Sequence, residues 1–184
     1  LIPALAFASE VVVVWDPRGD RATRDAAERL GARVFERAWG GFGPQRQFAL
    51  EQCTQPWVLW IDADERLDAP AIEWIRDVTD PRQRLPEEET HYMIRRSGFF
   101  LGRRIRWCGW QGEWLVRLFR REAARFDDAP VHEVVHVRGS GPEQLSGVLG
   151  ADAEKGATQL GAVMSHGFDE KQVAALTKSY DLTK

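Results

Sequence analysis

The chain has little cysteine and no long hydrophobic run. Its two cysteines, Cys53 and Cys108, are too few for a disulfide framework and do not have the spacing of a metal site. No apolar stretch approaches the roughly 20 residues that a membrane-spanning helix requires. The apolar start at residues 1–7 lacks the charged leader and the length of a signal peptide. These absences make a reducing, cytoplasmic compartment the expected location.

Lysine is also scarce, and it is confined to one end. All 21 arginines lie at or before Arg138, whereas all four lysines lie at or after Lys155. We therefore expect residues 139–184 to form a separate segment. The composition, 43% hydrophobic and 29% charged with a mean hydropathy of −0.40, is typical of a globular protein with one core. The net charge of −3 says little about partners by itself.

Arginine is concentrated between Arg95 and Arg125. Nine arginines there meet only two glutamates, a local balance of 9 − 2 = +7, and Trp107, Trp110 and Trp114 lie among them. Such a segment suits phosphates, anionic lipid headgroups or the face of a sugar. A nucleic-acid partner is not expected, because the whole chain is acidic and no nucleic-acid motif accompanies the segment.

The most informative stretch is the apolar run at residues 57–61 and the acids that follow it. The run predicts a strand buried on both faces, as in a parallel α/β sheet. Asp62 and Asp64 follow at the carboxyl end of that strand, where ligands gather in α/β folds. Their i, i+2 spacing lets both side chains point the same way and offer oxygen ligands to magnesium or manganese. The alternative interpretation is two solvated acids before the helix that begins near Asp68 and Pro70.

Strands and helices are predicted to alternate in the first half of the chain. The predicted strands are at 11–14, 33–35 and 57–61, and the predicted helices are at 22–30, 44–53 and 71–78. Three β-like runs follow, at 91–96, 114–120 and 131–137, and a last short helix is predicted at 170–178. Alternation predicts that Trp114, Val116 and Leu118 share one face of their strand. This order fits one α/β domain, with a site where its parallel and antiparallel halves meet.

Several sequence segments together carry a family resemblance. In order they are VVVVWD at 11–16, LGARVF at 30–35, GGFGPQRQFAL at 40–50, WVLWIDADER at 57–66, GFFLGRRIR at 98–106, WLVRLFRR at 114–121 and ARFDDAPVHE at 124–133. This order resembles the bacterial family-2 glycosyltransferases related to lipopolysaccharide-core β-glucosyltransferases. The resemblance runs to Glu133 and continues faintly through His166, Lys178 and Tyr180.

The resemblance implies a GT-A fold, in which helices flank a mixed sheet. It implies a single catalytic domain at residues 1–138, followed by a partly irregular segment at 139–184. It also implies a nucleotide-sugar donor, expected to be UDP-linked, and a divalent cation, magnesium or manganese. The nucleotide would bind on the first half of the sheet and the acceptor on the second.

The resemblance also implies roles for four acids. Asp16 lies where the family has an acid for the base or ribose of the nucleotide. Asp62 and Asp64 lie on the family's Asp-x-Asp, whose second member usually reaches the metal. Glu133 lies where these enzymes carry the catalytic base.

Basic residues could assist these acids. Arg117 and Arg120 could make paired contacts to the diphosphate, and Arg46 could reach the nucleotide from its helix. Solvated surface arginines are the alternative for all three. His132 is expected to be a structural histidine, and His166 is either a further metal ligand or a loop residue.

The expected function is inverting sugar transfer from the nucleotide-sugar to a saccharide or lipid-linked acceptor, in cell-envelope polysaccharide or lipopolysaccharide biosynthesis. The acceptor and the Arg/Trp segment favour peripheral contact with the cytoplasmic face of the inner membrane. Two departures from the family are visible. The opening strand with its Asn-Glu pair has no counterpart, and residues 17–21 replace a loop of small residues. We therefore expect the chain to be a fragment or a diverged copy.

Two other classes stay open. A phosphotransferase of the haloacid-dehalogenase type also uses Asp-x-Asp with magnesium. That class has Thr or Val at the position where this chain has Arg66. A non-catalytic remnant that keeps the sheet and serves as a binding module is the stronger alternative.

Overall fold

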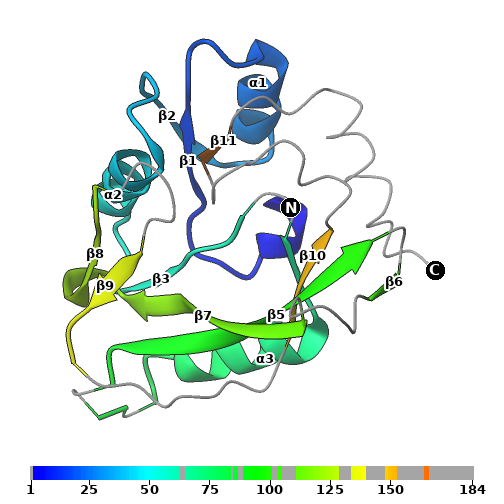
Figure 1. Ribbon diagram of the computed structural model, residues 1–184. Helices are drawn as coiled ribbons and strands as arrows, with labels where there is room; N and C mark the ends of the chain where they lie inside the picture. The colour runs from blue at the N-terminus through cyan, green and yellow to red at the C-terminus, as the bar shows by residue number, and fades with distance from the viewer. Residues whose placement is uncertain are drawn as a thin grey trace.

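Two main β-sheets and a two-stranded sheet, with helices between and around them, make up the part of the chain that the computed structural model describes (Figure 1). The described residues are 2–62, 65–83, 85–86, 89–100, 103–104, 111–128, 134–139, 148–152 and 164–165. Within them, no helix is long and apolar enough to cross a membrane.

The smaller sheet has the order β11-β1-β2 and is parallel throughout. Its central strand β1 (Val12–Trp15) is buried at every residue, as the β-branched run predicts. On either side lie β2 (Arg33–Glu36) and β11 (Met164–Ser165). The predicted strands at 11–14 and 33–35 are confirmed.

Helix α1 (Arg21–Arg29) joins β1 to β2. It begins where the side chain of Asp20 accepts a hydrogen bond from the Ala22 amide, a standard N-cap. It ends before Gly31, whose φ of 85° lies in the left-handed region that favours glycine. The predicted helix at 22–30 is confirmed within a residue at each end.

The larger sheet has the order β3-β7-β5-β10-β4, and β6 pairs with β5. Its strands are β3 (Trp57–Leu59), β4 (Glu65–Leu67), β5 (His91–Phe100), β6 (Arg103–Arg104), β7 (Gln111–Arg120) and β10 (Val148–Asp152). All pairs are antiparallel except β5 with β10. The predicted change from parallel to mainly antiparallel pairing is confirmed.

The prediction for residues 57–61 needs correction. Strand β3 covers only three of those residues, is partly buried, and pairs antiparallel with β7 at the edge of the described sheet. An apolar run reports burial but not strand direction, and direction depends here on the distant residues 118–120 of β7. A cavity of about 290 Å³ lies between β3 and β1, lined largely by apolar side chains.

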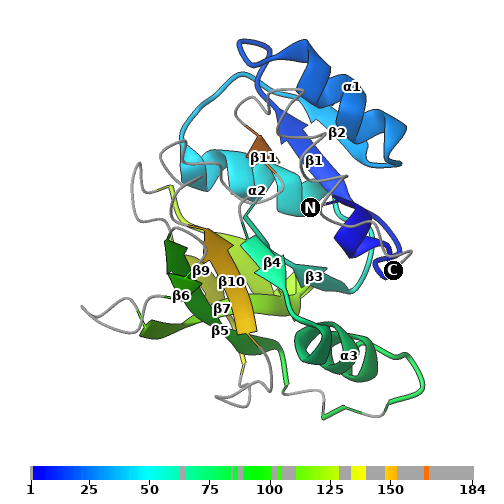
Figure 2. The same ribbon diagram turned by 90° about the vertical axis from the view of Figure 1, so that its right-hand side faces the viewer.

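Helix α2 (Phe42–Gln52) lies between the two sheets, and α3 (Ala69–Val78) lies beside the larger one (Figures 1 and 2). Ala49 of α2 packs in a core cluster with Val12 and Val14 of β1, and the next residue, Leu50, packs with Phe119 of β7. Adjacent residues of α2 therefore join both sheets into one packed unit.

Helix α3 buries Ala71 and Ile75. Ile75 packs with Tyr92 of β5 and Leu118 of β7 in the largest core cluster. The side chain of Asp68 caps the helix by accepting from the Ala71 amide. The predicted helices at 44–53 and 71–78 are therefore confirmed, although α2 begins two residues earlier than predicted.

The remaining described elements are short. They are the 3₁₀ turns η1 (Ile2–Leu5) and η2 (Arg121–Ala123) and a two-stranded sheet of β8 (Ala124–Phe126) and β9 (Val135–Val137). Strand β9 confirms the end of the run predicted at 131–137. The predicted helix at 170–178 lies outside the described residues. The division at residue 138 stays a prediction.

The alternation predicted for β7 is interrupted at Arg117. Tyr92 of β5 pairs with Leu118, and the next residue, Met93, pairs with Val116, so the register steps over Arg117. A residue inserted in this way locally shifts which side chains face each side of the sheet. Leu118 accordingly packs in one core cluster and Val116 in another. The prediction of one shared face is therefore wrong for Val116, whereas Trp114 packs against the same core cluster as Leu118.

Gly43 provides a test of the packing between α2 and the segment after β8. A Cβ added at Gly43 would lie 1.9 Å from the carbonyl oxygen of Asp127, and a backbone atom cannot rotate away. We expect Gly43→Ala to lower the free energy of unfolding by about 1–3 kcal/mol. Gly40→Ala is the matched control, because a Cβ there meets nothing within 4 Å. Equal thermal midpoints for the two variants would contradict the close approach.

Candidate active site

The turn between β3 and β4 carries the predicted acidic pair. Asp62 begins the turn and Glu65 ends it, while Ala63 and Asp64 lie outside the described residues. The Glu65 amide donates to the Asp62 carbonyl at 2.9 Å. In return, the Asp62 amide donates to Glu65 Oε2 at 2.8 Å. The two residues therefore close the turn on each other through both backbone and side chain.

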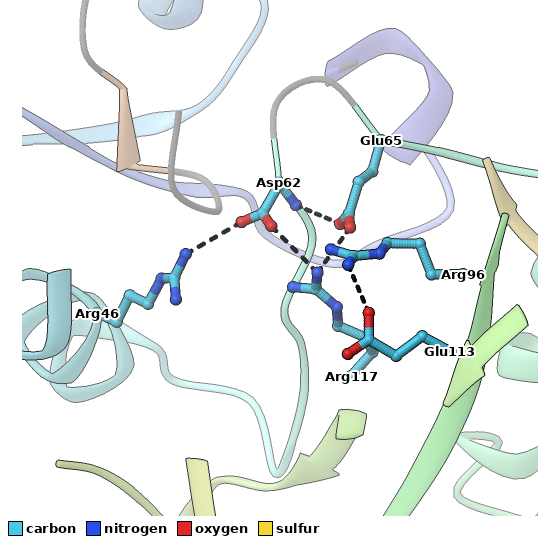
Figure 3. A network of polar contacts seen from close by, with 6 residues as sticks. All are labelled: Arg46, Asp62, Glu65, Arg96, Glu113 and Arg117. Atoms are coloured by element: carbon cyan, nitrogen blue, oxygen red, sulfur yellow. Dashed lines mark hydrogen bonds and ion pairs between the residues drawn. The ribbon is translucent and has the colours of Figure 1, made fainter. Parts of the chain in front are cut away.

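Arg117 joins this turn to β7. Its side chain is only 3% exposed, and its Nη2 donates to Glu65 Oε1 at 2.6 Å and to Asp62 Oδ2 at 3.1 Å (Figure 3). The Arg117 carbonyl also accepts from the Trp60 amide at 2.7 Å, one residue beyond β3. One residue of β7 thus holds both the end of β3 and the acidic turn.

Arg46 reaches the same acid from α2. Its Nη2 lies 3.4 Å from Asp62 Oδ1 and pairs with it (Figure 3). Burial lowers the pKa of Arg46 to about 10, while the Asp62 charge opposes that change. Arg46 nevertheless remains a cation at neutral pH.

Trp60 lies beneath both arginines. The guanidinium carbons of Arg46 and Arg117 lie 4.3 and 4.4 Å from the centroid of its ring, close enough for cation–π attraction. The ring packs edge-on against Phe126. Two cations therefore lie against the ring of one tryptophan. We refer to Arg46, Trp60, Asp62, Glu65 and Arg117 as the Asp62 cluster.

The Asp62 cluster balances its own charge. Two guanidinium groups meet two carboxylates, and the side chains of Arg46, Glu65 and Arg117 are at most 7% exposed. Both oxygens of Asp62 lie against guanidinium nitrogens. The predicted role of Asp62 as a metal ligand stays a prediction, and in this structure its carboxylate is shared between Arg46 and Arg117. No group of three or more His, Cys, Asp or Glu side chains suited to a metal occurs among the described residues.

Asp16 lies at the end of β1 and is 1% exposed. The Arg18 amide donates to Asp16 Oδ1 at 2.9 Å, and Arg18 Nη2 donates to Asp16 Oδ2 at 2.7 Å. The carboxylate raises the pKa of Arg18 through these bonds. The predicted nucleotide-binding acid is thus buried behind an arginine whose own side chain is 68% exposed.

Not all of the remaining predicted site residues lie in the Asp62 cluster. Arg120 Nε donates to the Glu89 carbonyl at 3.1 Å, and its guanidinium lies 4.7 Å from the centroid of the Trp57 ring. These contacts differ from those of Arg117, and nothing described joins Arg120 to Asp62. Asp64, Glu133, His132 and His166 lie outside the described residues, so their predicted roles stay predictions.

Glu65 is the member of the cluster to which sequence reasoning gave no role. The available signal was a third acid directly after the Asp-x-Asp pair, at the first residue of β4. Acids at a strand start are usually exposed, and the bonds from Arg117 and from the Asp62 amide explain why this one is 1% exposed.

Comparison with known proteins identifies the class. Residues 6–80 match the family described as Glycosyl transferase family 2. The chain is 30% identical over 158 residues to the lipopolysaccharide core biosynthesis glycosyltransferase LpsC of Rhizobium meliloti (strain 1021), covering 80% of this chain and 55% of LpsC. It is 42% identical over 59 residues to an uncharacterized glycosyltransferase of Rickettsia conorii, covering 32% of this chain and 21% of that relative.

These matches confirm the predicted resemblance and place the chain in the family-2 glycosyltransferases, among relatives of a lipopolysaccharide-core enzyme. The predicted α/β fold of GT-A type is confirmed with it. The chain spans about half the length of LpsC and about a fifth of the length of the Rickettsia conorii relative.

Asp62→Asn tests the charge balance of the cluster. The substitution removes the negative partner that two buried guanidinium groups share, and we expect a loss of about 3 kcal/mol in the free energy of unfolding. Urea unfolding followed by circular dichroism measures it.

The control for Asp62→Asn is Asp80→Asn. It breaks an ion pair with Arg82, whose side chain is 90% exposed, and should leave the urea midpoint nearly unchanged. An equally small effect of Asp62→Asn would mean that Asp62 does not stabilise the two arginines.

Proposed function

We propose that the chain is the catalytic part of an inverting glycosyltransferase of cell-envelope lipopolysaccharide biosynthesis. It would move a sugar from a nucleotide-diphosphate donor, UDP-linked, to a saccharide or lipid-linked acceptor. The observation that carries the proposal is the match of residues 6–80 to family 2, since this segment holds both Asp16 and the Asp62–Asp64 pair. A named lipopolysaccharide-core relative over 80% of the chain supports the substrate class.

The reaction itself makes three demands. The acceptor hydroxyl oxygen forms a bond to the anomeric carbon while the bond from that carbon to the diphosphate breaks. The hydroxyl proton passes to a base, and the nucleoside diphosphate leaves with the electron pair. A base, stabilisation of the leaving charge and alignment of the two reactants are therefore needed.

Glu133 is the proposed base. Its segment, ARFDDAPVHE, is part of the resemblance to family 2, and a carboxylate shielded from water can have its pKa raised toward neutrality. Inversion follows from direct attack by the activated hydroxyl on the face opposite the leaving group.

Family-2 enzymes generally use divalent cations, and in this proposal Asp64 would hold the magnesium or manganese ion. The ion would supply Lewis-acid stabilisation of the leaving diphosphate. Asp62, already neutralised by Arg46 and Arg117, is left out of direct coordination. Arg120 is proposed to contact the diphosphate, and none of its contacts among the described residues supports this role.

Asp16 is the proposed contact for the base or ribose of the nucleotide. It lies at the carboxyl end of β1, where ligands bind in α/β folds. Arg18 donates to both of its oxygens, so a nucleotide would have to share or displace that arginine. The proposed site of action is the cytoplasm, with peripheral contact to the inner membrane near the acceptor.

A non-catalytic binding module is the second candidate. It is favoured by the pairing of Arg18 with Asp16, which occupies the acid that the nucleotide needs. Calorimetry with UDP separates the two candidates. An enzyme should release heat that depends on added Mn²⁺, whereas a module without donor binding should release none.

Asp64→Asn tests the metal-dependent part of donor binding. Because the substitution removes the proposed metal ligand, we expect UDP affinity in the presence of Mn²⁺ to fall to the affinity measured without it. Asp80→Asn, at an acid that pairs with the exposed Arg82 and with no residue of the Asp62 cluster, should keep the Mn²⁺ effect. Retention of that effect in Asp64→Asn would remove Asp64 from the metal site.

Glu133→Gln tests the base. We expect kcat for sugar transfer to fall about 10²- to 10⁴-fold while the KM for the donor changes little, because the amide cannot accept the acceptor proton. Steady-state kinetics measures both constants. Glu28→Gln on α1, with a 45% exposed side chain, is the control and should leave kcat unchanged. Normal kcat in Glu133→Gln would exclude this base.

A further inference from the structure

We infer that Glu65 and Arg117 are positioning residues, which fix the turn carrying the acidic pair before any ligand binds. The inference rests on the proposed function, because the turn matters for catalysis only if Asp64 meets the donor. It reassigns Arg117, whose predicted role was direct contact with phosphate. It also gives Glu65 a role beside the acidic pair.

Glu65, at one end of the turn, makes two hydrogen bonds to Asp62 at the other end. Its amide and its Oε2 bond the carbonyl and the amide of Asp62, at 2.9 and 2.8 Å. Asp64 is enclosed in sequence between these two fixed residues. These bonds fix the backbone of Asp62 and of Glu65 relative to each other before a ligand arrives, which lowers the entropic cost of binding.

Arg117 ties the closed turn to the larger sheet. Its Nη2 reaches Glu65 Oε1 at 2.6 Å, and its carbonyl bonds the Trp60 amide at 2.7 Å. The shift in strand register at Arg117 lets this residue hold both the end of β3 and the turn. Its burial, at 3% exposure, leaves it poorly placed to meet a diphosphate from solvent.

The charge of Glu65 is required as well as its hydrogen bonds. Burial first, and then the positive charge of Arg117, lower the pKa of Arg46, and the two guanidinium groups repel each other beside Trp60. Asp62 alone cannot balance both. A glutamine at position 65 would place one NH₂ group against a donor, either the Asp62 amide or Arg117. Glu65→Gln therefore breaks the closure without removing volume.

A nearby ion pair provides the matched control. Arg96 of β5 and Glu113 of β7 form a pair between the strands of the same sheet (Figure 3). Their side chains are 40% and 55% exposed. Glu113→Gln thus makes the same chemical change in an exposed pair outside the turn.

The experiment compares Glu65→Gln with Glu113→Gln in two readouts on the whole chain. The first is amide hydrogen exchange without ligand, where we expect the Asp62 and Glu65 amides to exchange at least about tenfold faster in Glu65→Gln only. The second is UDP calorimetry with and without Mn²⁺. We expect Glu65→Gln to weaken the Mn²⁺-dependent affinity about 10- to 100-fold and to leave metal-free UDP binding unchanged.

The two readouts separate failure of the inference from failure of the proposed function. Unchanged exchange at Asp62 and Glu65 would overturn the closed turn, whatever the protein binds. Faster exchange with an unchanged Mn²⁺ effect would show a structural role only and would overturn the positioning role. Absence of any Mn²⁺ effect in the unsubstituted chain would instead contradict the proposed function, and the positioning role with it. The exchange rates of the Asp62 and Glu65 amides would still report whether the turn is closed.

Arg117→Lys is the second variant, for use if Glu65→Gln does not fold. It keeps the positive charge beside Asp62 but loses the guanidinium that spans Asp62 and Glu65. We expect faster exchange at the Glu65 amide and the same selective loss of the Mn²⁺ effect. Behaviour like that of the unsubstituted chain in both readouts would overturn the role of Arg117.

Discussion

The balance of four charges around Asp62, three of them buried and Asp62 itself half-buried, is the constraint on which the rest of the site depends. Arg46 comes from α2, Arg117 from β7, and both acids from the turn after β3. Buried charges are tolerated only when paired and hydrogen-bonded, so none of the four can be placed without the others. The cluster therefore requires α2, β3 and β7 to meet at one point, and the packing of α2 against both sheets brings them there.

The same balance accounts for one member of the acidic pair. Asp62 has a carboxylate held by two guanidinium groups, and its charge serves the protein interior. An Asp-x-Asp pattern in a sequence does not show that partnership, because Arg46 and Arg117 come from α2 and β7.

Local pattern was enough to predict most of the smaller sheet and all three α-helices, because burial, capping residues and glycine act within a few positions of each other. The run at Val12–Trp15, the Asp20 cap and the stop at Gly31 are examples. The antiparallel direction of β3 and the roles of Arg117 and Glu65 could not be predicted in this way. Each depends on a contact between residues more than 50 positions apart.

The shifted register of β7 bears on which changes in chain length the protein can accept. Deleting one residue between Trp114 and Leu118 would restore regular pairing with β5 but take Arg117 away from the turn. Insertions and deletions should therefore be rare in this strand among functional relatives.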